Sequence, residues 1–245
     1  MFTILVFMIK LGNLNLMKSI QLSPNSLNLF LECPYCFWLE KKLGIKKPLA
    51  YPYEFNKKVD ELLKEEFDLY RKQDLEPPLF KENNINAKLF KNQKLLNQWR
   101  SNLAGIRYFD EALGATLFGA VDDVLEFSKD RIAPLDYKST GMTVAKIYDR
   151  FQLQMDVYTF LMEKNGYKTT GKGYLAFYVV DKSRGFVDRL PFRKEIIEIE
   201  TNPSDIYEIF KEAVITLKNQ MPKKHSKDCQ LGKWFDAVKS PDFNS

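Results

Sequence analysis

The stretch from Gly119 to Tyr158 constrains the fold of this chain more than any other. It holds two apolar, strand-like runs, GAVDDVLEF and IAPLDYKST, which the polar turn SKDR separates. A helical pattern, FQLQMDVYTFLMEK, follows the second run. A β-hairpin followed by a helix predicts an α/β layer, in which each strand carries an acidic residue.

Asp122 and Asp136 are those acidic residues. They lie 14 positions apart, and their midpoint, residue 129, falls in the SKDR turn. An antiparallel hairpin would place them opposite each other, within about 6 Å, where like charges destabilise the pair. A divalent cation between them would remove that cost and could support phosphodiester cleavage. The alternative is an exposed Asp–Lys cross-strand face without a metal.

Three further side chains are candidates for this site. Lys138 comes two residues after Asp136, so it should share a strand face with it and could hold an attacking water or stabilise developing charge. Asp123 should point to the opposite face. Gln154 could bond a base or the lysine, and Tyr158, one helical turn later, could stack on a base or bond a phosphate. Ordinary helix packing is the alternative for both.

The rest of the chain adds helices around this stretch. Ser23-Pro24 predicts a helix start, Pro34 interrupts that helix, and Gly44 ends it. Strands broken at Gly114 are predicted within 107–127, and a second hairpin is predicted from strands at 173–181 and 185–192. Further helices are predicted at 54–71, 85–103, 145–165 and 203–220, with a loop at 72–84. This order predicts an α/β core with helical flanks.

Composition and the N-terminus narrow the class of protein. At 245 residues the chain can form one large domain, and its net charge of +5 is compatible with a polyanionic partner. Three cysteines are too few for a disulfide framework, so we expect a reducing cytoplasm. The apolar start within residues 1–18 is too short to span a membrane, so we expect a leader, a disordered start or a short packed strand, and no membrane partner.

The motifs resemble those of the RecB-like branch of the PD-(D/E)XK nuclease superfamily, which includes AddB-type and CRISPR-associated adaptation exonucleases. That branch has a Gly-x-x-Asp strand, an Asp-x-Lys strand and Gln-x-x-x-Tyr on a helix. This chain carries them at 119–122, 136–138 and 154–158. The resemblance spans roughly residues 20–235. It implies a restriction-endonuclease-like core, with a mixed central sheet flanked by helices and an N-terminal helical segment.

The resemblance also implies roles for the site residues. Asp122, Asp136 and the carbonyl of Tyr137 would bind Mg²⁺ or Mn²⁺, and Lys138 would do catalytic work. The branch carries an earlier ligand, often His, on a helix, and Asp60 looks like that position. A carboxylate can replace His there because hard cations favour oxygen. A solvated helix residue is the alternative for Asp60.

The three cysteines and the only histidine form a second constellation. Cys33-x-x-Cys36 and His225-x-x-x-Cys229 have the spacing of a structural Cys₃His zinc site, which would clamp the first helix to the C-terminus. Several members of the branch hold a [4Fe-4S] cluster with one N-terminal and three C-terminal cysteines. Here Gly232 stands where the next cysteine would be, so the full cluster set is absent. Buried cysteines without metal are the third interpretation.

We therefore predict a Mg²⁺- or Mn²⁺-dependent deoxyribonuclease, an exonuclease that acts on single-stranded or end-exposed DNA. Its pathway would be DNA repair, recombination or CRISPR adaptation, with an integrase or a helicase as partner. A non-catalytic nucleic-acid-binding scaffold and an RNase are the alternatives. Basic clusters and nearby aromatic residues suit single-stranded DNA, at 40–47, 57–58 and 218–227 and at Tyr35, Phe37, Trp38 and Tyr51.

We divide the chain into four parts. A leader at 1–18 precedes a helical region at 19–100 that carries the first metal-ligand motif. The nuclease core follows at 101–221, and a tail at 222–245 carries the metal staple.

Overall fold

The computed structural model describes residues 19–46, 54–186 and 188–239. The predicted leader at 1–18 lies outside the described residues. The described chain begins with strand β1 (Ile20–Leu22) and helices α2 (Pro24–Glu32) and α3 (Pro34–Leu43). The sequence explains these boundaries, because the Ser23 side chain accepts the Ser26 N–H at the start of α2 and Gly44 adopts a positive φ of 70° after α3.

The centre of the molecule is a mixed sheet in the order β2-β5-β6-β8-β9. Strands β5 (Asp123–Phe127) and β6 (Arg131–Thr140) form the predicted antiparallel hairpin, and Lys129 at its turn has a positive φ of 64°. Strand β6 pairs in parallel with β8 (Lys172–Val180), which pairs antiparallel with β9 (Phe192–Glu200). The remaining members are β2 (Lys88–Leu89) and β7 (Lys168–Thr169), which pairs with β6. The mixed sheet and its helices confirm the predicted α/β class.

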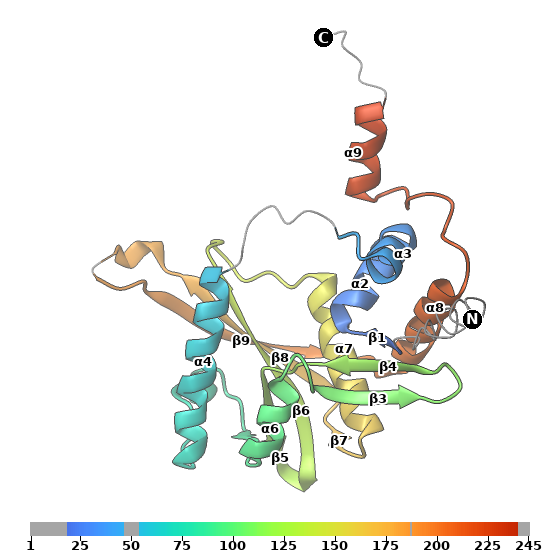
Figure 1. Cartoon of the computed structure of the whole chain (residues 1–245). Coiled ribbons are helices and arrows are strands. Elements are labelled where there is room, and N and C mark those ends of the chain that lie inside the picture. Colours follow the sequence, from blue (N-terminus) through green and yellow to red (C-terminus); the bar gives the residue numbers. More distant parts are fainter. Residues whose placement is uncertain (1–18, 47–53, 187, 240–245) are drawn as a thin grey trace, which may run out of the picture.

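A smaller sheet adjoins the central one. Strand β4 (Ala115–Gly119) pairs in parallel with β1 and antiparallel with β3 (Ile106–Asp110). The chain runs from β4 into β5 through residues 120–122, so the two sheets are neighbours along the chain and in space (Figure 1). The N-terminal segment therefore contributes β1 to this smaller sheet in addition to its helices.

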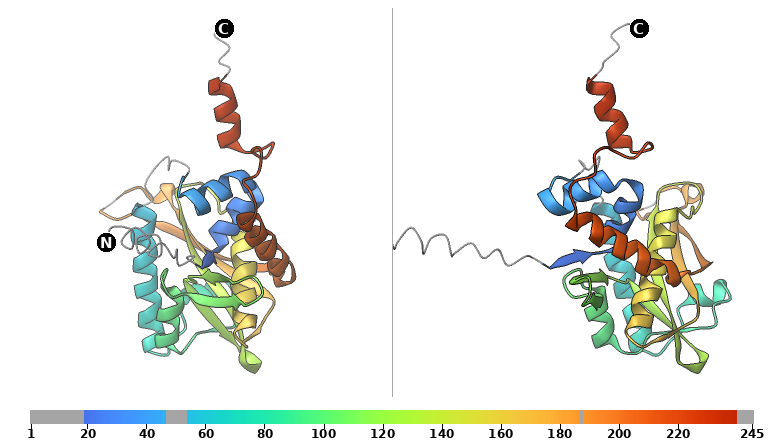
Figure 2. Two further views of the ribbon diagram at one scale, coloured as in Figure 1. Left: turned by 45° about the vertical axis from the view of Figure 1, so that its right-hand side comes forward. Right: turned by 90° about the vertical axis from the view of Figure 1, so that its right-hand side faces the viewer.

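Helices cover both faces of the central sheet, as the views in Figures 1 and 2 show. Helix α7 (Asp149–Lys164) packs on one face together with α2 and α8 (Ile206–Lys218), and α4 (Glu54–Lys72) packs on the other. The alternation of β6 divides its side chains between the two cores. Leu135 and Tyr137 face α4, and Ile132 belongs to the α7 core. Asp136, between two α4-facing residues, therefore points toward α7.

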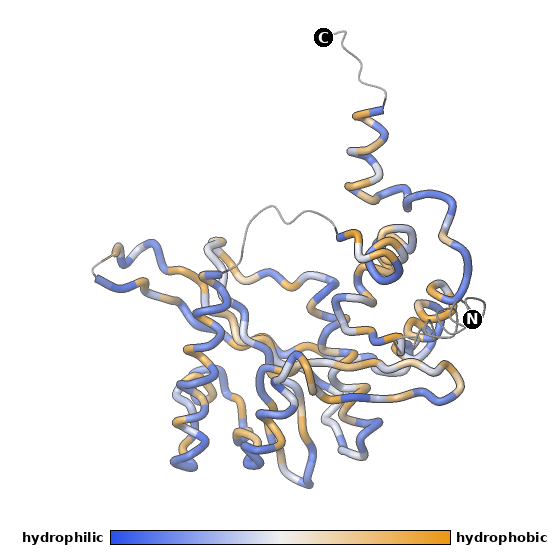
Figure 3. Tube along the Cα trace, viewed as in Figure 1, coloured by the Kyte–Doolittle hydropathy of each residue, from blue (hydrophilic) through white to orange (hydrophobic). Residues whose placement is uncertain are grey.

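The buried stripe of α4 is narrower than the set of apolar residues in the helix. Val59, Leu63 and Phe67 pack on the sheet, whereas Phe55 and Leu62 are 58% and 62% exposed. The period of 3.6 identified the helix correctly, but only its central stripe touches the sheet. Figure 3 shows the resulting mixture of hydrophilic and hydrophobic residues along this helix.

Four short or charged segments differ from the prediction. The predicted loop at 72–84 contains α5 (Pro78–Glu82), and the predicted helix at 85–103 contains β2 before α6 (Gln93–Arg100). The second strand of the later hairpin is β9, which begins at the last residue of the predicted range 185–192, because its charged sequence hides the strand pattern. Helix α9 (Gln230–Lys239) lies in the predicted tail and projects from the body (Figure 1). The described chain also has 3₁₀ turns at Ser128–Asp130, Lys182–Arg184 and Pro203–Asp205.

No helix in the described ranges combines the length and the apolar character that a membrane span requires.

Candidate functional site

A pocket of about 750 Å³ opens where the β5–β6 hairpin, α4 and α7 meet. Asp60 of α4, Asp122 just before β5, and Asp136 and Lys138 of β6 line it, together with Gln154 of α7. The structure thus brings together residues that lie up to 94 positions apart in the sequence, from 60 to 154. Basic residues also line this pocket, at Lys57, Lys146 and Arg150.

The hairpin register places Asp122 and Asp136 as the sequence predicted. Asp123 pairs with Leu135 and Val124 with Pro134, and one more step along this register sets Asp122 opposite Asp136. The Tyr137 N–H donates a hydrogen bond of 3.1 Å to Asp122 Oδ2, which fixes that carboxylate against β6. Asp136 itself is 1% exposed.

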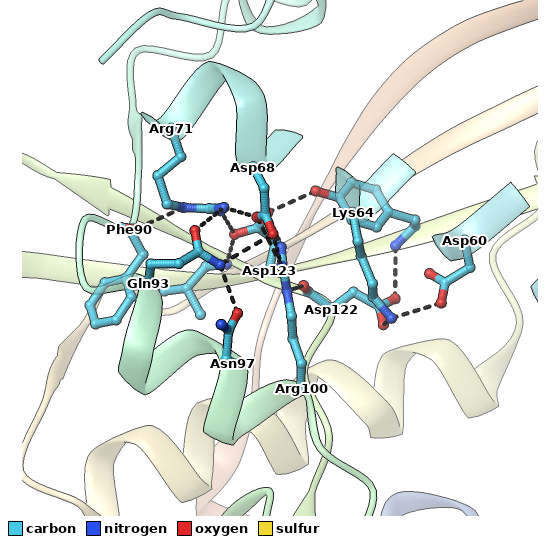
Figure 4. Close-up of polar contacts among 12 residues, drawn as sticks. Asp60, Lys64, Asp68, Arg71, Phe90, Gln93, Asn97, Arg100, Asp122 and Asp123 are labelled. Atoms are coloured by element: carbon cyan, nitrogen blue, oxygen red, sulfur yellow. Dashed lines mark hydrogen bonds and ion pairs between the residues drawn. The ribbon is translucent and has the colours of Figure 1, made fainter. Parts of the chain in front are cut away.

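Lys64 inserts a cation among the carboxylates. Its Nζ lies 2.7 Å from Asp60 Oδ2 and 2.7 Å from Asp122 Oδ1, so it bridges α4 and the start of β5 (Figure 4). Burial opposes its charge, but Asp122 and Asp60 outweigh that effect and raise the pKa of Lys64. The second oxygen of Asp60, Oδ1, is buried without a hydrogen-bond partner.

A chain of hydrogen bonds holds Lys138 from α7. Lys138 forms an ion pair with Asp136 and donates a 3.0 Å hydrogen bond to Gln154 Oε1. Gln154 Nε2 donates to the Tyr158 hydroxyl at 2.8 Å, and that hydroxyl donates to the Ala120 carbonyl at 2.7 Å. Of the two predicted partners of Gln154, a base or the lysine, the structure shows the lysine. Tyr158 is 3% exposed and packs in the core, which agrees with the alternative of ordinary helix packing and leaves no exposed ring face to stack on a base.

Gly119 explains why Tyr158 can reach this position. A Cβ atom on Gly119 would lie 2.7 Å from Tyr158 Cε1 and 2.9 Å from Cδ1. The absence of a side chain at this position therefore lets the ring pack directly on β4. This gives the Gly-x-x-Asp motif a physical role: its glycine positions the tyrosine, and its aspartate enters the pocket.

Asp123 points away from the pocket, as expected, into a buried ionic network (Figure 4). It is 0% exposed and forms ion pairs with Arg71 and, at 3.0 Å, with Arg100. Arg100 also donates a 2.6 Å hydrogen bond from Nε to the Asp122 carbonyl and pairs with Asp68 at 2.8 Å. The network thus fixes the backbone of Asp122, a pocket residue, from the side that faces away from the pocket.

Burial and crowding alter the acid–base behaviour of the pocket. Burial raises the pKa of Asp136 from its usual 3.8 to about 7; Lys138 opposes this change and Asp122 adds to it. Burial also raises the pKa of Asp60, with a further contribution from Asp122, and Lys64 opposes both. A cation that binds the charged form of these carboxyl groups would stabilise their ionised state and so lower their pKa.

The cysteines and the histidine also come together, at a separate place on the molecule. The ligand-capable atoms of Cys33, Cys36, His225 and Cys229 all lie within 4.8 Å of one another. Cys33 lies between α2 and α3 and Cys36 in the first turn of α3, whereas His225 and Cys229 lie between α8 and α9. The sequence spacing had predicted this proximity.

The predicted aromatic platform for DNA is only partly on the surface. Phe37 is 0% exposed and belongs to the core, so its expected contact with DNA is wrong. Tyr35 packs on His225 with ring centroids 4.3 Å apart, and the indole N–H of Trp38 donates to the Asn219 carbonyl. Tyr51 lies outside the described residues.

Comparison with known proteins identifies the family of this chain. The model of the PD-(D/E)XK nuclease superfamily matches residues 21–231. The chain belongs to this superfamily. The match covers every described pocket and cluster residue named above, and members of the superfamily are generally nucleases that use divalent metals.

The wider comparisons add little to the superfamily assignment. Among solved structures, the chain is similar to one described as "Crystal structure of SSO0001", at 13% identity and a TM-score of 0.43. The similarity covers 91% of this chain and 89% of that one. Comparison with curated proteins found no matching relative.

Sequence reasoning missed two contributors to the PD-(D/E)XK pocket. Lys64 follows Asp60 by four positions, so helical spacing could have placed it on the same face of α4. Arg100 carried no such signal, because its contact with the Asp122 carbonyl depends on how α6 docks beside β5.

Proposed function

We propose that this protein is a Mg²⁺- or Mn²⁺-dependent deoxyribonuclease of the RecB-like type, an exonuclease on single-stranded or end-exposed DNA. The observation that supports it most is the convergence of Asp60, Asp122, Asp136 and Lys138 on one pocket of a PD-(D/E)XK core. Acidic ligands beside a lysine suit phosphodiester hydrolysis, because the acids bind a hard cation and the lysine stabilises negative charge.

The residues of the pocket fit a divalent metal. Asp60 Oδ1 is buried and lacks a hydrogen-bond partner, and Asp136 lies opposite Asp122 in the hairpin register. Asp60, Asp122 and Asp136 would hold the ion, with the backbone carbonyl of Tyr137 beside them. When bound, the ion supplies a Lewis acid for the scissile phosphate and lowers the pKa of a bound water.

The chain's own residues would do the remaining work. Lys138 would orient the attacking water and donate hydrogen bonds to a phosphate oxygen. Gln154 is a positioning residue, since it accepts a hydrogen bond from Lys138 and is itself held by Tyr158. Lys64 would have to leave its bridge between Asp60 and Asp122 as the metal enters, because the ammonium and the ion compete for the same oxygens.

The substrate proposal rests on the charge around the pocket. Lys57, Lys146 and Arg150 line it, and the Arg150 guanidinium lies 4.9 Å from the Tyr148 ring centroid. Basic side chains beside half-buried aromatic rings such as Tyr148 suit the backbone and bases of single-stranded nucleic acid. The pathway would be DNA repair, recombination or CRISPR adaptation, with an integrase or a helicase as partner, in the cytoplasm.

The test uses purified protein with single- and double-stranded DNA labelled at either the 5′ or the 3′ end. Cleavage is measured with Mg²⁺, with Mn²⁺ and with EDTA. We expect metal-dependent products in the wild type and at least about a 100-fold loss of rate in Asp136→Asn and Lys138→Met. The two labels report the polarity of cleavage, and matched RNA substrates test the RNase alternative.

A matched control comes from Lys129→Met, which removes an exposed lysine in the hairpin turn far along β6 from the pocket. It should cleave like the wild type. DNA binding without cleavage by the wild type under every metal condition would contradict the proposal and support the non-catalytic scaffold.

A further inference from the structure

The Cys/His cluster lies outside the nuclease pocket and has no role in the proposed chemistry. Cys33, Cys36 and Cys229 are 0%, 4% and 5% exposed, and His225 is half-buried beside them. Leu29, Tyr35 and Leu231 pack around the three sulfurs. Four metal-binding side chains thus converge in one small, largely water-excluded volume.

The distances within this cluster match the coordination shell of a single ion. His225 Nδ1 lies 3.7 Å from Cys33 Sγ, 3.4 Å from Cys36 Sγ and 3.5 Å from Cys229 Sγ, and the last two sulfurs are 3.6 Å apart. Bonds of about 2.3 Å from zinc to sulfur and about 2.0 Å to nitrogen place tetrahedral ligand atoms roughly 3.5–3.8 Å apart. The spacing is much longer than the roughly 2 Å of a disulfide.

The surrounding backbone is shaped for histidine as the fourth ligand. A Cβ atom on Gly232 would lie 2.6 Å from His225 Cβ and 2.8 Å from its Cγ. A cysteine at position 232, as an iron–sulfur set would require, therefore cannot coexist with this placement of His225. The Gly232 N–H instead donates to Cys229 Sγ, and the Ser226 N–H donates to Cys33 Sγ. Backbone N–H donors to sulfur favour thiolates, the form that binds metal.

We propose that Cys33, Cys36, His225 and Cys229 bind one structural Zn²⁺ ion. The set is closed, with four protein ligands and no position left for water or substrate, which is typical of structural zinc. The ion links the α2–α3 junction to the segment between α8 and α9. An iron–sulfur cube needs its ligand atoms much farther apart than a single ion does, so this compact set favours zinc.

The consequence for the molecule is attachment of its C-terminal segment. Residues 222–239 follow α8, and α9 projects beyond α3 in all three ribbon views (Figures 1 and 2). The hydrogen bonds that join His225, Ser226 and Cys229 to the N-terminal helices run to the thiols of Cys33 and Cys36. Zinc would replace these weak sulfur contacts with coordination bonds, which are much stronger.

The first test measures metal in the full chain, purified without a polyhistidine tag and under reducing conditions. We expect about one zinc per chain by mass spectrometry of the metals, with neither iron nor acid-labile sulfide. Asp136→Asn, which alters only the nuclease pocket, should retain that zinc, so failure of the proposed nuclease would leave this result unchanged. Cys36→Ser should lower the content at least fivefold.

A second measurement keeps the proposal testable if Cys36→Ser fails to fold. Wild-type protein stripped of metal and given Co²⁺ should show the intense visible bands of tetrahedral cobalt and a sulfur-to-cobalt charge-transfer band. His225→Cys should keep zinc, because it preserves four ligands, whereas His225→Ala should bind it more weakly. Iron with labile sulfide, or three thiols that react equally fast with and without a chelator in a zinc-free protein, would overturn the proposal.

Discussion

Asp136 is the single residue whose surroundings conflict most with its charge. Its carboxyl is buried on the central strand, and its partners include both Lys138 and a second carboxyl, Asp122. An isolated acid in such a place would remain neutral at physiological pH. A bound cation changes that balance, so the protonation of this one side chain and metal binding must be linked.

In buffer without divalent cations, the stability of the protein should depend on pH through Asp136. Because the pKa of Asp136 is raised to about 7, the folded protein keeps a proton there that the unfolded chain loses near pH 4. The free energy of unfolding should therefore fall as pH rises from about 4 to about 7 and then level off. Urea unfolding at a series of pH values measures this, and the same series on Asp136→Asn should slope less steeply. Parallel profiles for the two proteins would contradict the assignment.

Removal of the Lys64 ammonium should lower the stability of the metal-free protein and strengthen its binding of metal. Lys64→Met removes the cation that bridges Asp60 and Asp122, so the metal-free protein should lose stability from the repulsion left behind. The same change should lower the Mn²⁺ concentration needed for half-maximal binding, because the metal no longer displaces an ammonium. Calorimetric titration and thermal unfolding measure the two effects. Lys58→Met, on the exposed face of the same helix, should change neither.

At the scale of the element, β6 and α7 act together. The strand presents Asp136 and Lys138, and the helix holds Lys138 through Gln154 and Tyr158. The close approach of α7 depends on Gly119, whose missing side chain admits the tyrosine ring. A substitution that displaces α7 from β4 should therefore also move Lys138.

Gly119→Ala tests this contact. Its methyl group would overlap the Tyr158 ring, so we expect a loss of about 1–3 kcal/mol in the free energy of unfolding and a lower cleavage rate in the protein that still folds. Denaturant titration and the end-label assay measure the two. Gly141→Ala is the matched control for stability, because nothing lies within 4 Å of its added Cβ. An equal effect of the two substitutions on the free energy of unfolding would refute the role given to Gly119.

The buried ionic network around Asp123 should contribute both to stability and to metal binding. Arg100→Met should leave Asp123 with one arginine instead of two and free the Asp122 carbonyl. Breaking a buried ionic network costs about 3–5 kcal/mol, and the variant should also bind metal more weakly through the displaced Asp122 backbone. Unfolding in urea and metal titration check both effects. Unchanged metal affinity in a destabilised variant would limit Arg100 to a structural role.

Elements with strong local patterns could be predicted, and short ones could not. The β5–β6 hairpin followed from two apolar runs around a polar turn, and α4 and α7 followed from helical periodicity. Strand β2 has two residues and α5 has five, too few to show a period. The ionic network around Asp123 depends on how α4, α6 and β5 dock together, and docking is not a local property of the sequence.

The whole molecule places basic residues around an acidic pocket. The chain carries a net charge of +5, and Lys146 and Arg150 stand at the pocket that holds the aspartates. The acids would be neutralised by metal, which leaves the basic groups free to attract a polyanion. Binding of nucleic acid should then depend on metal as well as on salt.

Arg150→Glu tests this arrangement, in an Asp136→Asn background that prevents cleavage. Its affinity for a single-stranded oligonucleotide should fall at least about tenfold, with a shallower dependence on salt, since each lost phosphate contact reduces the slope by roughly 0.7. Fluorescence anisotropy at several salt concentrations measures both. Lys129→Glu makes the same charge change in the hairpin turn. If it weakens binding equally, the effect is one of net charge and the pocket is not the binding surface.

The position of β6 between β5 and β8 has a consequence for how the pocket moves. Around Asp136 the strand pairs with β8, and the Tyr137 N–H donates to the Asp122 carboxylate. The amide protons there should therefore exchange with deuterium only when the sheet itself opens. Asp60 belongs instead to α4, which contacts the sheet through an apolar stripe and through the ion pairs of Lys64 and Arg71. These are side-chain contacts, so the backbone of the helix around Asp60 should open at lower cost than the paired strand. The candidate ligands are thus divided between a slowly exchanging strand and a faster helix. Metal binding should slow exchange mainly in α4, because the ion would hold that helix against the sheet.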